Sequence, residues 1–88
     1  MANIRDLKKD INYVLGDIIE EVYVWELLNP KADTKKSEAI IDEAIEVFDD
    51  LIAKVNDRSV EDRAAQMKAV NKTLEDRGRK LIEKINKL

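Results

Sequence analysis

Apolar residues recur at intervals of three and four along almost the whole chain, which is the period of an amphipathic α-helix. The spacing predicts three helices, over residues 3–28, 34–56 and 60–87. Pro30 sets the end of the first helix, because the residue before a proline disfavours helical backbone angles. The core stripe expected on this helix consists of Ile4, Leu7, Ile11, Val14, Leu15, Ile18, Val22 and Trp25.

The second and third predicted helices differ in the width of their apolar faces. The second has a wide face, as expected for a helix packed between two others: Ile40, Ile41, Ala44, Ile45, Val47, Phe48, Leu51, Ile52 and Val55. The third has a narrow stripe with the steps of four and three of a coiled coil: Val60, Ala64, Met67, Asn71, Leu74, Gly78, Leu81, Ile85 and Leu88. Within it, we expect Asn71 to fix the register and Gly78 to admit a large side chain, such as Trp25 or Phe48, against the backbone.

Two helix starts carry capping signals. Asn3 is a predicted N-cap of the first helix. The segment Ser59-Val60-Glu61-Asp62 is a variant of the capping box and predicts Ser59 as the N-cap of the third. The connections between the helices are short, so neighbouring helices must run antiparallel. We therefore predict one all-α domain, residues 1–88, folded as an antiparallel up-down-up three-helix bundle.

The composition removes most catalytic and metal-binding classes. The chain has no cysteine and no histidine, which disulfides, thiolate sites and histidine-dependent triads require. Its two glycines, Gly16 and Gly78, are too far apart to form a phosphate-binding loop. The acids between Asp42 and Asp50 lack the Glu-x-x-His pairs of carboxylate-bridged metal bundles, so we interpret them as a solvated face. We predict no enzymatic activity, no metal or other cofactor, and no small-molecule ligand.

Charge is unevenly distributed in a chain whose formal net charge is −3. The first two predicted helices are acidic and the third is basic. Nucleic-acid association through the third helix is therefore an alternative function, although Glu75, Asp76 and Glu83 interrupt its basic runs and no aromatic residue is interleaved for base stacking. No apolar run approaches the length of a membrane span, and residues 1–10 contain no apolar signal core. A cytoplasmic location is the expectation.

The C-terminal half of the first predicted helix is apolar outside its core stripe as well. Two neighbours in a small bundle cannot surround a whole helix, so these side chains are either covered by the 29–33 loop and the other helices or exposed to another chain. The sequence leaves both possibilities open. The leading hypothesis is a non-enzymatic bundle that forms a homodimer or docks on a protein partner. Its candidate interface consists of Tyr13, Tyr23, Val24, Leu27 and Leu28.

The opening of the chain also carries a resemblance. The residues from Met1 to Ile19, MANIRDLKKDINYVLGDII, followed by the helical pattern through Leu88, resemble a family of small uncharacterised bacterial all-helical proteins. That family has no assigned activity. The resemblance therefore implies a helical fold and transfers no catalytic or binding residue.

Overall fold

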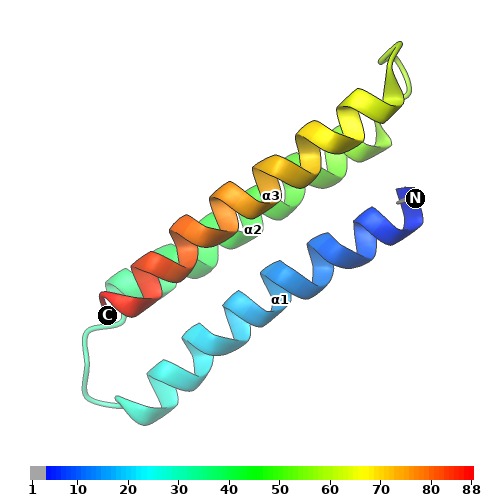
Figure 1. Ribbon diagram of the computed structural model, residues 1–88. Helices are drawn as coiled ribbons and strands as arrows, with labels where there is room; N and C mark the ends of the chain where they lie inside the picture. Colours follow the sequence, from blue (N-terminus) through cyan, green and yellow to red (C-terminus); the bar gives the residue numbers. More distant parts are fainter. Residues whose placement is uncertain (1–3) are drawn as a thin grey trace.

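Three α-helices make up the computed structural model, which describes residues 4–88 (Figure 1). They are α1 (Ile4–Leu28), α2 (Lys35–Asn56) and α3 (Arg63–Asn86). α1 and α3 run parallel to each other and antiparallel to α2, and together they form a rod of 50 × 20 × 17 Å (Figure 1). The predicted all-α three-helix bundle is confirmed. The predicted N-cap Asn3 lies outside the described residues.

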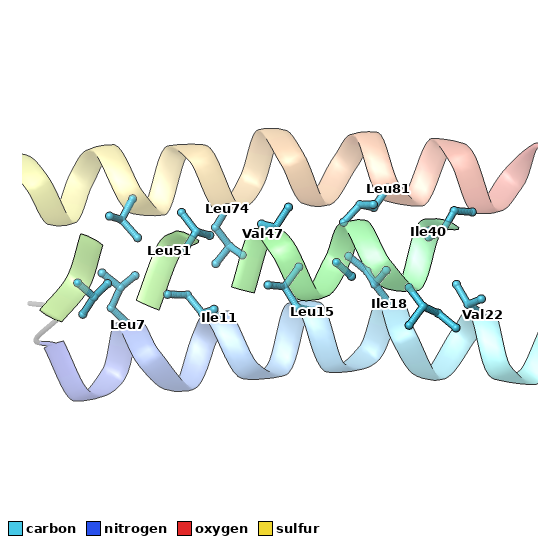
Figure 2. Close-up of a cluster of buried hydrophobic side chains, with 14 residues drawn as sticks. Leu7, Ile11, Leu15, Ile18, Val22, Ile40, Val47, Leu51, Leu74 and Leu81 are labelled. Atoms are coloured by element: carbon cyan, nitrogen blue, oxygen red, sulfur yellow. The ribbon is translucent and has the colours of Figure 1, made fainter. Parts of the chain in front are cut away.

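The core is a continuous column of aliphatic side chains along the axis of the rod. Figure 2 shows the stripe of α1 pointing at α2 and α3, with Leu7, Ile11, Leu15, Ile18 and Val22 all buried. Burying one such side chain contributes about 1.5–3 kcal/mol to the free energy of unfolding. The other helices contribute Ile40, Ile41, Ala44, Val47, Leu51, Val55, Val70, Leu74 and Leu81.

Several residues predicted for the core lie at its edges instead. Val14 and Ile45 are exposed, and Trp25 and Phe48 are only half-buried. Each belongs to the margin of a broad stripe, where an α-helix turns its side chains away from the axis of the bundle. The inner residues of the predicted α1 and α2 stripes are in the core as expected.

The predicted register of α3 is wrong in part of its first half, although Met67 packs against the core as expected. Val70 is buried there, whereas Asn71 and Ala64 are exposed and Val60 precedes the helix. Counting back from Leu74 at about 100° per residue, Val70 lies about 40° from the direction of Leu74 and Asn71 about 60° from it. Val70 is therefore closer to the buried face than Asn71.

The predicted cap of α3 is also wrong. The helix begins at Arg63, and the side chain of Asp62 caps it by accepting a hydrogen bond from the backbone N–H of Ala65 at 3.0 Å. Ser59 is not at the cap position, because it lies in the loop before the helix, where its backbone N–H and its hydroxyl both donate to Oδ1 of Asp57, at 2.9 and 2.6 Å. The local turn at Asp57 competes with helix initiation and holds the following residues as a loop.

Gly78 has different neighbours from those predicted. A Cβ atom at this position would lie 3.4 Å from Cγ1 of Val14 and 3.9 Å from Cδ1 of Ile18, both on α1. The prediction that it admits Trp25 or Phe48 is therefore wrong. Gly78 instead lowers the surface of α3 where the two parallel helices approach each other.

Candidate protein-docking face

All five candidate interface residues are exposed: Tyr13, Tyr23, Val24, Leu27 and Leu28. Leu27 and Leu28, at the end of α1, remain 79% and 76% exposed. The chain beyond them turns at once, with the backbone N–H and side-chain Nδ2 of Asn29 both donating to the carbonyl oxygen of Trp25 at 3.0 and 2.9 Å. Of the two possibilities that the sequence left open, coverage by the 29–33 loop is therefore wrong.

The structure divides these five residues between two surfaces. Tyr13, Val24 and Leu28 line hollows between α1 and α3. Tyr23 and Leu27 lie farther round α1, because successive residues of a helix are rotated by about 100°. The five residues predicted as one patch therefore form two adjoining surfaces. Tyr13, Val24 and Leu28 line the hollows, and Tyr23 and Leu27 form an outward-facing surface beside them, which we call the shoulder.

Two hollows of about 520 Å³ each lie along the seam between α1 and α3. We call this seam the α1–α3 groove. It is defined by its apolar residues, which are Tyr13, Val14, Val24, Trp25 and Leu28 on α1 and Leu74, Gly78, Ile82 and Ile85 on α3. The hollows follow each other along the rod, because α1 and α3 run parallel (Figure 1). Hollows of this size admit several side chains of a partner.

Carboxylates dominate the polar rim of the groove. Five acids and one base line the two hollows: Asp10, Asp17, Glu20, Glu21, Glu75 and Arg79. The acids on the α1 wall alternate along the chain with the apolar residues Val14, Val24 and Leu28. An apolar floor with an acidic rim favours a ligand that combines apolar and cationic groups.

A buried serine fixes the end of α1 that carries the groove. The hydroxyl of Ser37, fully buried at the start of α2, lies 3.2 Å from Oε2 of Glu26 and 3.0 Å from the carbonyl oxygen of Thr34. Its single proton can bond to only one of these oxygens at a time, and both bonds hold the start of α2 in place. We interpret Ser37 as a structural tie between α1 and α2.

Two ion pairs attach the basic helix α3 to α2. Nη1 of Arg77 lies 3.4 Å from Oδ2 of Asp50, and Nζ of Lys84 lies 2.5 Å from Oε2 of Glu43. These contacts turn two members of the α2 acidic cluster toward α3 and occupy two of the cations that a nucleic acid would need. Partly exposed pairs of this kind contribute at most about 1 kcal/mol each, so they orient α3 more than they stabilise it.

Residues 4–88 contain neither a metal-type cluster of side chains nor a helix suited to a membrane. No group of three or more acidic side chains is placed to hold a metal ion in this part of the chain. Within the same residues, every helix is too short or too polar to cross a membrane.

Sequence reasoning missed the α3 wall of the groove. Ile82 belonged to no predicted stripe, and Ile85 and Val14 were assigned to the core. A signal was present, because steps of four and three also define a second row on α1, which shares only Val14 with the predicted core stripe. That row is Asp10, Val14, Asp17, Glu21, Val24 and Leu28. Because three of its residues are acids, the spacing of apolar residues alone does not reveal this row.

Comparison of the chain with protein families, with curated proteins and with solved structures finds no match. The resemblance to small bacterial helical proteins therefore stays a prediction. The features of this chain that bear on function are the geometry and charge of the α1–α3 groove and of the shoulder beside it.

Proposed function

We propose that this chain is a non-enzymatic protein-docking bundle of the cytoplasm, which associates with another protein chain through the C-terminal half of α1. The observation that carries the proposal is the exposure of Tyr23, Val24, Leu27 and Leu28 within two turns of one helix. Covering a side chain such as Leu28 contributes about 1.5–3 kcal/mol, so a second chain gains substantially by packing here. Contiguous exposed apolar patches of this kind mark association sites on folded domains.

Association can take either of two forms. In a homodimer, a two-fold axis brings the same patch of both copies together, which is the simplest closed arrangement. In a hetero-complex, the surface of a different protein covers the patch. Both forms require Val24 and Leu28 to be buried in the complex, so one pair of substitutions tests them together.

The first test measures mass in solution by light scattering over a range of concentrations. We expect Val24→Glu with Leu28→Glu to keep the helical circular dichroism and to lose any mass above the monomer, because charged side chains cannot be buried unpaired. Ile45→Glu is the matched control, since Ile45 on α2 is as exposed as Val24, at 47% and 46%. Unfolding of the double variant would instead place these side chains in the monomer core and contradict the proposal.

A wild-type chain that is monomeric at high micromolar concentration would rule out the homodimer and leave the hetero-complex to be tested. A photo-crosslinking amino acid at position 28 should then capture a discrete protein in the native cell. The same group at position 45 should not. Equal capture from both positions, or none from either, would contradict docking through α1.

A further inference from the structure

We infer that the α1–α3 groove receives a basic amphipathic helix of a different protein, which completes a four-helix bundle. This inference rests on the proposed docking function and specifies the chemistry of the partner. It is supported by the spacing of the residues that line the groove, by the length of the groove, and by the charge of its rim.

Both walls of the groove present residues at heptad spacing. The row on α1 is Asp10, Val14, Asp17, Glu21, Val24 and Leu28, and the row on α3 is Asn71, Glu75, Gly78, Ile82 and Ile85. In each row the steps alternate between four and three, which is the spacing by which helices pack side by side at about 20°. Two parallel helices with facing rows of this kind form the seat for another helix.

The dimensions fit a helical partner. From Asp10 to Leu28 the two hollows together span about 27 Å of α1 at 1.5 Å per residue, which matches a helix of about 18 residues. Gly78 removes a side chain midway along the α3 wall, and Trp25 provides a large apolar surface near the far end. A partner can therefore place its apolar residues between Val14 and Leu28 without displacing the core.

The charge of the rim identifies a basic partner and opposes a second copy of this chain. With five carboxylates and one guanidinium along the groove, Lys or Arg beside the apolar stripe of the partner would be paired on both sides. A second copy would bring the same acids against Asp17 and Glu21, and like charges at an interface suppress such pairing. Anionic membranes and nucleic acids are disfavoured at this face for the same reason.

The test uses Trp25, the only tryptophan of the chain, as an intrinsic reporter in the groove. Two stapled helical peptides of about 18 residues are titrated into the full chain. Both carry Leu at the apolar heptad positions and neither contains Trp. One has Lys at the flanking positions and the other has Glu. We expect the Lys peptide to shift the Trp25 emission to shorter wavelength and to bind at least about tenfold more tightly than the Glu peptide, a preference that weakens from about 50 to about 500 mM salt.

Matched variants locate the binding site on the chain. Asp17→Asn with Glu21→Gln should weaken the Lys peptide about fivefold, whereas Asp42→Asn with Glu46→Gln on the exposed side of α2 removes the same charge and should leave the affinity unchanged. Val24→Glu with Leu28→Glu should abolish the shift of the Trp25 emission. Equal binding of the two peptides, equal loss from both acid pairs, or no emission shift with either peptide would overturn the inference.

One outcome separates this inference from the proposed function. If wild type is a dimer by light scattering and Trp25 is shielded from an added quencher only in the dimer, a second copy occupies the groove. Docking through α1 then stands, and the basic partner is wrong. Conversely, binding of the Lys peptide that survives Val24→Glu with Leu28→Glu would show that the peptide binds outside the groove, which also overturns the inference.

Discussion

The two glycines of the chain provide a matched test of helix stability and of the distance between α1 and α3. Gly16 lies on the exposed side of α1, where an added Cβ atom has no neighbour within 4 Å. Gly78 is buried in α3, where the added atom would lie 3.4 Å from Cγ1 of Val14. Neither glycine has a positive φ angle, so alanine fits the backbone at both positions.

The expected gains follow from helix propensity and burial. A glycine within a helix costs about 1 kcal/mol relative to alanine, so Gly16→Ala should raise the free energy of unfolding by about that amount. Gly78→Ala adds the burial of one methyl group, worth about 0.8 kcal/mol, at an ordinary contact distance from Val14. The expected gain is therefore about 1–2 kcal/mol. Each kcal/mol raises the melting temperature of a domain this size by about 4–8 °C.

Urea unfolding followed by circular dichroism measures both variants against wild type. The slope of free energy against urea should be unchanged, because alanine does not alter the surface exposed on unfolding. An unchanged midpoint for Gly16→Ala would refute the assignment of continuous helix at that point of α1. A loss of more than about 1 kcal/mol for Gly78→Ala would mean that α1 and α3 lie too close for a methyl group. It would contradict the distance of 3.4 Å between the added Cβ atom and Cγ1 of Val14.

Three further predictions test the core, the register of α3 and the loop before it. Leu15→Ala should cost about 2–5 kcal/mol in urea unfolding, because Leu15 is buried at the centre of the column, and a cost under about 1 kcal/mol would contradict that position. Val70→Ala should cost about 1–3 kcal/mol and Asn71→Ala less than about 0.5, so equal costs would restore the strict heptad register. Hydrogen bonds from the side chain and then the backbone of Ser59 hold the pKa of Asp57 below its ordinary value, so Ser59→Ala should raise that pKa in an NMR titration. Because the folded-state pKa is the lower one, the stabilisation by these bonds is present above the ordinary carboxyl pKa and lost as the pH falls through the folded value. Since alanine keeps the backbone N–H, a pKa unmoved by Ser59→Ala would exclude the Ser59 hydroxyl as the main cause.

The three helices and most of the core could be predicted because their signals repeat. Five buried residues of α1, from Leu7 to Val22, follow one period, so an error at a single position does not move the stripe. Pro30 marks the end of α1 independently of that period. Fold class follows from the agreement of many weak signals along the chain.

The start and register of α3 could not be predicted because each depends on a single local competition. Ser59 and Asp62 are both acceptable N-caps by residue type, but in the structure Ser59 is bonded to Asp57 within the loop and Asp62 accepts the hydrogen bond from Ala65. Because α3 begins at Arg63, the residues of the preceding loop cannot belong to its apolar stripe. On this turn of α3 the buried residue is Val70, whereas a strict heptad stripe predicts Asn71.

The candidate site was only half visible in the sequence, because a groove is a property of two helices. Val24 and Leu28 lie too far from the core stripe of α1 to be buried, so their exposure is predictable from one helix alone. Ile85, which lines the same hollow, is more than fifty residues later, and only the parallel packing of α1 and α3 brings the two rows together.

The acids within the α1 row have a consistent physical explanation once the groove is recognised. A fully apolar row would drive the chain to associate with copies of itself, because the hydrophobic effect does not discriminate between surfaces. Asp17 and Glu21 keep that row hydrated in the free chain and repel an identical face. A cationic helix loses little by desolvating these carboxylates, since each then pairs with a Lys or Arg. The same two side chains would thus oppose self-association and select a basic partner, so neutralising them should weaken heterotypic binding and strengthen homotypic contact in one protein.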